Sequence, residues 1–206
     1  MKFQLSAALM GLAATAVSAQ DTQTGPFNLQ IKGTNHNSKI NGYGSSCHTG
    51  AGISSICYGT TVDASEYNQY FFNYTGYNKV GNDQAGTLIW NLPYTGPDGP
   101  ALESQAMGLD FQTTSNVAGT MFGFSQFTFI VGFNGEGELF GYNYVDDSKF
   151  TAGKSPTDLT PKAYYQWAVC YQYFTGYYYQ SLAWVQVGAP HNPTCEPVTV
   201  TKVKAA

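Results

Sequence analysis

The sequence predicts an all-β fold: a single antiparallel β-sandwich, jelly-roll or concanavalin-like, with long loops and two disulfides. Short segments in which apolar and polar residues alternate recur along the chain. Clusters of glycine, proline and asparagine, which favour turns, separate these segments. No window combines a helical hydrophobic period with capping residues. Roughly ten short strands in one domain favour a sandwich.

The first 19 residues are expected to be a signal peptide. Lys2 precedes an apolar run of 13 residues, Leu5 to Val17, and the small residues Val17-Ser18-Ala19 form a cleavage site. The run is shorter than the roughly 20 residues that span a bilayer. The C-terminal end also lacks the hydrophobic tail of a lipid-anchor signal. We therefore expect residues 1–19 to be removed and residues 20–206 to form one secreted, extracellular domain.

The strands are expected in the following order. Phe27, Leu29 and Ile31 alternate with polar residues and predict the first strand. The segment 33–57 is rich in glycine, serine and asparagine and predicts a long loop. The other strands are expected at residues 67–74, 87–92, 106–111, 121–124, 127–133, 138–144, 164–173, 177–187 and 198–203. A second long polar loop is expected at 146–162. Function often lies on such loops, although ordinary surface loops are the alternative.

Four cysteines predict two disulfides in an oxidising compartment. Of the three connectivities, we expect Cys47–Cys57 and Cys170–Cys195, because each pair is close in sequence and brackets a turn-rich stretch. No two cysteines or histidines have the spacing of a zinc finger, so no metal and no cofactor are expected. Asn73-Tyr74-Thr75 is a sequon, and Asn73 is therefore expected to carry a glycan.

The charge composition argues against two classes of partner. Charged residues make up 11% of the chain, and arginine is absent. Without Lys2, eight basic residues remain against 13 acidic ones, a formal charge of −5. Binding to phosphate backbones or anionic membranes needs clustered cations. We therefore expect neither nucleic acid nor a membrane as partner.

The segment 164–187 predicts an aromatic hairpin. One face of its first strand is expected to pack in the core: Tyr165, Trp167, Val169, Tyr171 and Tyr173. A three-residue turn at 174–176 leaves rings and amides together on the other face, as in sugar-binding surfaces: Tyr164, Gln166, Tyr178, Gln180 and Trp184. A two-residue turn at Thr175-Gly176 would instead pair Trp167 with Trp184 and exchange the faces of the second strand. Structural packing of these rings is the alternative to ligand binding, and the more frequent role of such rings.

Few residues in the sequence could act together in catalysis, and no catalytic residue is assigned. The sequence holds no G-x-S-x-G elbow, and its three histidines are far apart. A mature N-terminus at Gln20 argues against copper oxygenases, which begin with histidine. The only carboxyl pair considered for a hydrolase is Asp110 with a glutamate such as Glu138, which retaining glycosidases would place about 5–5.5 Å apart.

Several motifs run in order through nearly the whole mature region: Cys47-His48-Thr49-Gly50-Ala51-Gly52-Ile53, Cys57-Tyr58-Gly59, Ser115-Asn116-Val117-Ala118, Trp167-Ala168-Val169-Cys170, Thr175-Gly176-Tyr177, Leu182-Ala183-Trp184-Val185 and Asn192-Pro193-Thr194-Cys195. In these motifs the chain resembles an uncharacterised family of small secreted fungal proteins, known as a domain of unknown function. The resemblance implies a secreted, disulfide-bonded β-sandwich from a filamentous fungus, and implies no activity.

Two functions are therefore expected from the sequence. The first is a non-catalytic extracellular protein that binds a glycan or a cell-wall polymer, or acts at a host interface. Its support is the predicted secretion, the face of rings and amides, and the lack of a catalytic set. The alternative is a secreted hydrolase of polysaccharides that uses paired carboxylates.

Overall fold

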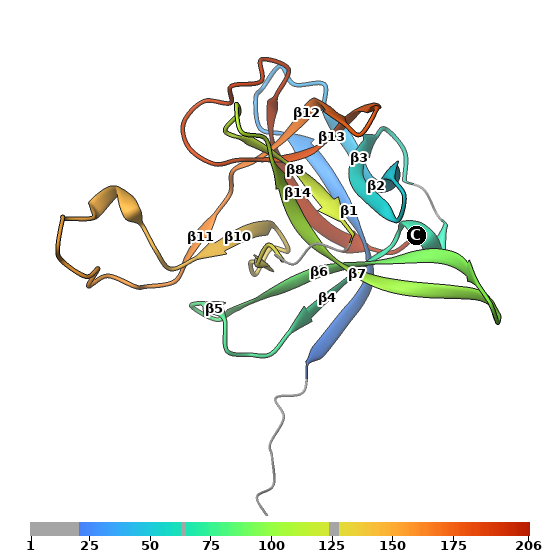
Figure 1. The fold of residues 1–206 in the computed structure, drawn as a ribbon, viewed down its shortest axis with the longest axis horizontal. Coiled ribbons are helices and arrows are strands. Elements are labelled where there is room, and N and C mark those ends of the chain that lie inside the picture. The colour runs from blue at the N-terminus through green and yellow to red at the C-terminus, as the bar shows by residue number, and fades with distance from the viewer. Residues whose placement is uncertain (1–20, 63–64, 124–127) are drawn as a thin grey trace, which may run out of the picture.

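The computed structural model describes residues 21–62, 65–123 and 128–206 (Figure 1). The predicted signal peptide lies outside these residues. The described part is all-β, as predicted, with two 3₁₀ turns and no α-helix. The strands are β1 (Thr22–Gly33), β2 (Asn41–Gly50), β3 (Ile53–Gly59), β4 (Tyr70–Tyr74), β5 (Lys79–Val80), β6 (Asp83–Gly96), β7 (Gly99–Phe111), β8 (Val117–Phe122), β9 (Val131–Phe133), β10 (Leu139–Asn143), β11 (Lys162–Tyr164), β12 (Trp167–Phe174), β13 (Tyr177–Val185) and β14 (Glu196–Lys204). The 3₁₀ turns are η1 (Glu66–Asn68) and η2 (Asp147–Lys149).

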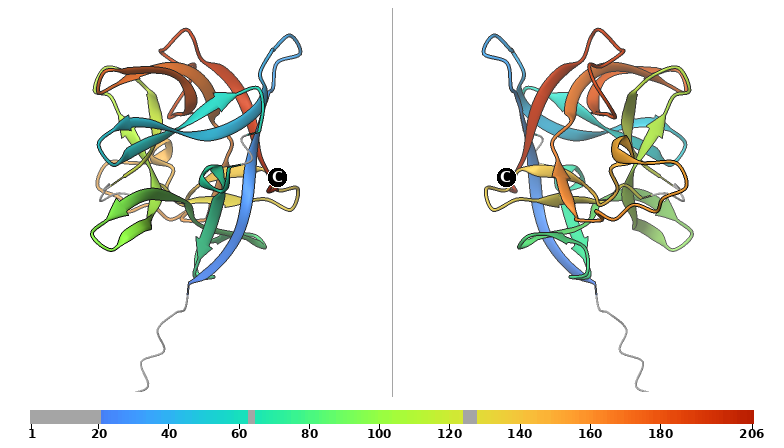
Figure 2. Two further views of the ribbon diagram at one scale, coloured as in Figure 1. Left: turned by 90° about the vertical axis from the view of Figure 1, so that its right-hand side faces the viewer. Right: turned by 90° about the vertical axis from the view of Figure 1, so that its left-hand side faces the viewer.

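The predicted sandwich is wrong, because the strands close into a barrel. Nine strands follow one another round the ring in the order β6, β4, β1, β14, β12, β13, β3, β8 and β7, and β7 pairs again with β6. Figure 2 shows the strands wrapped around a common interior. Every strand pairing in the ring is antiparallel. Alternation of apolar and polar residues is the same in a sandwich and a barrel, so the sequence pattern does not separate them.

Long strands close the barrel by changing partners along their length. β1 pairs with β14 over Phe27–Gly33, whereas its other edge pairs first with β4 and then, from Leu29, with β2. β2 continues to β3, so residues 33–57 hold two strands in place of the predicted long loop. β6 pairs with β7 and also with β9, which starts a small side sheet of β9, β10 and β11 (Figure 1). This side sheet stands against the barrel and forms one wall of the groove described below.

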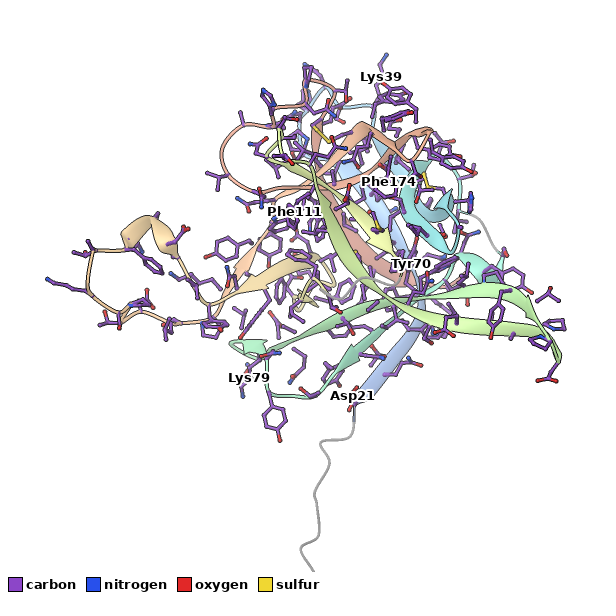
Figure 3. All side chains as sticks on the ribbon, viewed as in Figure 1. Asp21, Lys39, Tyr70, Lys79, Phe111 and Phe174 are labelled. Atoms are coloured by element: carbon purple, nitrogen blue, oxygen red, sulfur yellow. A yellow bond between two sulfur atoms is a disulfide. The ribbon has the colours of Figure 1, made fainter. Side chains whose placement is uncertain are left out.

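The barrel interior is filled by aromatic and branched side chains. Trp167 and Val169 are buried, as predicted, and Leu182 and Trp184 of the neighbouring strand lie with them in the main core. Tyr70 of β4 also lies within the core and stacks on Phe122, with 6.0 Å between ring centres (Figure 3). Burial of this apolar surface contributes roughly 25 cal/mol per Å² to folding, an upper estimate.

The hairpin of β12 and β13 takes the two-residue turn, so the three-residue turn is wrong. Thr175 (φ 48°) and Gly176 (φ 99°) both lie in the left-handed region, as in a type I′ turn. Trp167 consequently pairs with Trp184. The Thr175 hydroxyl donates to the carbonyl of Thr49 in β2.

The predicted core position of three tyrosines is wrong. Tyr165 is 45% exposed, Tyr171 44% and Tyr173 64%. The hairpin is buried on both faces from Trp167 to Cys170, and beyond that point its residues alternate between exposed and half-buried. Tyr171 stacks on Tyr178 at 5.5 Å instead of entering the core. Alternation therefore predicted the side of the strand correctly, but did not predict where the barrel ends.

Both predicted disulfides are confirmed. Cys47–Cys57 joins β2 to β3, and Cys170–Cys195 joins β12 to the segment that precedes β14. The second disulfide lies in a small cluster on the outside of the barrel with alanine and valine side chains of β8, β12 and β13. In the described residues no helix is long and apolar enough to cross a membrane.

Candidate functional site

A groove of about 490 Å³ lies between the barrel and the side sheet. We call it the side groove. Aromatic rings of four strands and one loop line it: Phe111, Phe129, Tyr142, Tyr164 and Trp184. Amides and carboxyls stand between the rings: Asn143, Asp146, Asp147, Gln166 and Gln186. Phe111, at the end of β7, is labelled in Figure 3 and is 55% exposed.

The floor of the side groove is a packed aromatic cluster. Trp184 contacts the rings of Trp167 at 4.8 Å and Phe129 at 5.0 Å. The indole N–H of Trp167 donates to the carbonyl of Leu139 at 2.9 Å. Gly141 of β10 passes directly over this cluster, since a Cβ there would lie 2.5 Å from the Trp184 ring. The floor is therefore held from both sides, by the barrel and by the side sheet.

The charged edge of the side groove comes from the turn at η2. Asp146 accepts hydrogen bonds from the side chain and backbone of Ser148, and Lys149 lies 3.4 Å from its carboxylate. The hydrogen bond from the Ser148 hydroxyl, followed by Lys149, lowers the pKa of Asp146. Asp146 is thus held ionised on the solvent side of the groove, where it can accept hydrogen bonds from a ligand.

The side groove brings together three of the five predicted sugar-binding residues, Tyr164, Gln166 and Trp184. Tyr164 and Gln166 are half-buried, whereas Trp184 is only 7% exposed and forms the floor. The other two, Tyr178 and Gln180, lie outside the groove on the outer part of β13. Tyr178 and Gln180 lie at the turn end of the hairpin, opposite Tyr173 and Tyr171, whereas Trp184 lies at its buried end opposite Trp167.

Sequence reasoning missed Phe111 and Tyr142. They come from two different strands, and only the pairing of β10 with β9 and of β13 with β8 brings them to one groove. The predicted polar loop at 146–162 gave a partial signal, since Asp146 and Asp147 at its start line the groove.

The carboxyl pair considered for hydrolysis is not brought together. Asp110 lies on the outer wall of the barrel opposite Gly119 of β8, and burial raises its pKa. Glu138 lies at the turn before β10, where the side-chain amide of Asn134 donates to it at 3.3 Å. Among the grooves and pockets of the described residues, no common one is lined by both carboxyls.

Two further predicted sites can be located. Asn73 of β4 is half-buried, and its side-chain oxygen accepts a hydrogen bond from Gln23 at 2.8 Å. Its neighbour Phe72 fills the core, so the Asn73 side chain points to the outside of the barrel. In the described residues no three histidine, cysteine, aspartate or glutamate side chains are grouped to hold a metal ion.

Fold and groove together define a class: a disulfide-bonded β-barrel with an open groove of rings, amides and carboxyls. Residues 24–203 match the model of a family described as a domain of unknown function (DUF7907), and the chain belongs to this family. The predicted membership of a family known as a domain of unknown function is thereby confirmed. Searches of curated proteins and of solved structures returned no match for the chain.

Proposed function

We propose that this protein is a secreted, non-catalytic protein that binds a glycan of a cell wall or other extracellular surface, and that the side groove holds the sugar. The observation that carries the proposal is the lining of the groove, in which rings, all but Trp184 exposed or half-buried, lie among amides and carboxylates. Rings pack against the apolar faces of a pyranose, and amides and carboxylates hydrogen-bond to its hydroxyl groups.

The size of the side groove agrees with this class of ligand. Small-molecule sites usually measure about 300–1,000 Å³, and a groove of about 490 Å³ lies within that range. The packing of Trp184 against Trp167 and Phe129 supports a preformed site, because these rings are fixed before a ligand binds.

Secretion is supported by the signal-peptide pattern of residues 1–19 and by two disulfides, which form in oxidising compartments. The intact mass of protein recovered from the medium of a secreting host tests it. A mature N-terminus at Gln20 supports the proposal, and protein that stays in the cells with residues 1–19 attached contradicts it.

The glycan-binding proposal is tested by retention on insoluble chitin, β-glucan and cellulose. The protein should be retained on at least one of them. Tyr164→Ala and Gln166→Ala should each weaken retention about two- to tenfold, because a ring contact or a hydrogen bond contributes about 0.5–1.5 kcal/mol. Tyr77→Ala is the matched control, since Tyr77 is 78% exposed and does not line the groove.

Thermal unfolding of each variant separates binding from folding. Gln166 is half-buried and its side chain forms no hydrogen bond within the described residues, so its replacement should change the melting temperature by no more than a few degrees. The proposal is wrong if none of the three polymers retains the protein, or if Gln166→Ala and Tyr164→Ala are retained as well as the unsubstituted protein.

A further inference from the structure

A narrow pocket lies on the outer wall of the barrel, separate from the side groove. It encloses about 30 Å³, room for roughly two water-sized groups. The side chains that matter come from five strands: Thr49 of β2, Asp110 of β7, Gln172 of β12, and Tyr177, Tyr179 and Ser181 of β13, with Gly119 of β8 below them. We call it the Asp110 pocket.

The carboxylate in this pocket has no partner. Asp110 is partly buried, and in the part of the chain that the structure describes it forms no hydrogen bond and no ion pair. Burial raises its pKa, because the charged form is poorly solvated there. A carboxylate in this state gains from any cation that enters the pocket.

A second polar atom in the pocket is also unpartnered. Thr49 is 5% exposed, and its hydroxyl oxygen is buried without a hydrogen-bond partner. The neighbouring polar groups are already paired, since the Ser181 hydroxyl donates to the Gln172 amide oxygen at 2.8 Å. The Gln172 amide fits here because Gly119 has no side chain, and a Cβ there would lie 3.3 Å from the amide. The pocket therefore has one free carboxylate, that of Asp110, and an unpartnered hydroxyl, that of Thr49, in its wall.

The walls of the pocket favour an organic cation over a metal ion. The rings of Tyr177 and Tyr179 stack with 6.0 Å between centres, and both line the pocket. Aromatic rings attract ammonium groups, and this attraction grows when the cation is desolvated. A single carboxylate and one hydroxyl are too few oxygen ligands for calcium, which takes six to eight. A primary ammonium group donates three hydrogen bonds and fits the space.

The surface beside the pocket indicates what carries the ammonium group. An adjoining hollow of about 300 Å³ shares Gln112, Gln172 and Tyr173 with the pocket. It adds the stacked rings of Tyr171 and Tyr178 and a further amide, Asn192. Rings and amides suit a sugar, as in the side groove, and the net charge of −4 favours a cationic polymer.

We propose that the Asp110 pocket binds the ammonium group of one unit of an amino-sugar glycan, and that a further unit lies on Tyr171 and Tyr178, on the other face of the hairpin. The proposal rests on the proposed glycan-binding function and names its substrate class. It also gives a role to Tyr178, which the side groove leaves aside.

The test compares two oligosaccharides of equal length, oligomers of glucosamine and oligomers of N-acetylglucosamine, by calorimetry on the disulfide-bonded protein at fixed ionic strength. The amine oligomer should bind at least about tenfold more tightly, because a charge-assisted hydrogen bond is formed only with the ammonium. Asp110→Asn keeps the shape and removes the charge, so it should abolish this preference. Asp98→Asn removes the same charge from an exposed turn and should preserve it.

Stability provides the folding control. Asp110→Asn removes a poorly solvated, unpaired carboxylate, so the melting temperature at neutral pH should stay the same or rise. Equal binding of the two oligomers, or a preference that survives in Asp110→Asn, overturns the proposal.

Failure of the glycan-binding function gives a different result. In that case neither oligomer binds and the insoluble glycans retain nothing. Methylammonium chloride is then the probe: shifts of the Tyr177 and Tyr179 resonances that disappear in Asp110→Asn would show an ammonium site without a sugar. A lysine peptide that binds while both oligomers do not would assign the pocket to a protein partner and overturn the amino-sugar proposal.

Discussion

At the scale of single residues, the hydroxyl of Tyr70 is a buried polar group without a compensating hydrogen bond. Tyr70 is fully buried, and its hydroxyl has no hydrogen-bond partner. Burial raises its pKa, since the phenolate could not be solvated there. The ring itself is well packed through its stacking on Phe122. The favourable part of this side chain is therefore its ring, and the hydroxyl opposes folding.

Tyr70→Phe is expected to stabilise the protein by about 1 kcal/mol, because it keeps the ring and removes the unpaired hydroxyl. For a domain of this size the melting temperature should rise by about 2–4 °C. Thermal and urea unfolding measure the change. Tyr77→Phe, at an exposed ring, is the control and should change neither quantity. A loss of stability in Tyr70→Phe would mean that the hydroxyl is satisfied in solution.

The predictions for single residues were confirmed where one sequence pattern is enough to place the side chain. Trp167 and Val169 are buried because two-residue alternation fixes the face of a strand. The disulfide partners followed from proximity in sequence. Tyr171 and Tyr173 share that same face and are nevertheless exposed, because burial also requires a neighbouring element to cover the strand. The alternation of apolar and polar residues does not indicate where along the strand the covering elements end.

At the scale of elements, β2 and β3 show how glycines permit strands in an unpromising sequence. Their segment was expected to be a loop, since glycine, serine and asparagine have low β-propensity. In the barrel the absence of side chains is what allows close packing. A Cβ at Gly42 would lie 2.1 Å from the carbonyl oxygen of Gly59, and one at Gly44 would lie 2.7 Å from Ile56. Propensity was thus overridden by tertiary packing.

Gly42→Ala is therefore expected to destabilise the protein by about 1–3 kcal/mol, because the obstructing atom belongs to the backbone of a paired strand. Urea unfolding measures the loss. Gly135→Ala is the matched control: a Cβ there meets no atom within 4 Å, and its effect should be close to zero. If the two variants unfold at the same urea concentration, β2 and β3 are less closely packed than described.

At the scale of the whole molecule, the barrel is closed by strand pairings of unequal length, and we call the pairing between two neighbouring strands a seam. β1 and β14 pair over seven residues, and β2 and β3 also pair over seven. In contrast, β12 and β14 pair only at Ala168↔Pro197 and Val169↔Glu196, and proline has no N–H to donate. The sequence could not predict this closure, because ring order depends on which distant strands meet. The side groove, which needs the barrel and the side sheet together, was hidden for the same reason.

The Cys170–Cys195 disulfide lies directly beside this short seam, and we expect it to hold the barrel closed there. The chain-entropy model attributes about 3.5 kcal/mol to a closed loop of 25 residues and about 2.7 kcal/mol to one of 10, the separation in Cys47–Cys57. Replacing Cys170 and Cys195 by alanine should therefore cost at least about 3.5 kcal/mol, measured by urea unfolding.

Hydrogen exchange locates the effect. Amide protection in β12 and β14 should fall first in the variant without Cys170–Cys195, because the seam has few hydrogen bonds of its own. Replacing Cys47 and Cys57 by alanine is the control, since the long ladder of β2 and β3 remains and only a smaller, global loss should follow. If the control variant loses as much stability, or if β12 and β14 stay protected in the first variant, closure does not depend on this disulfide. The hydrogen bonds around the ring would then hold the barrel closed without it.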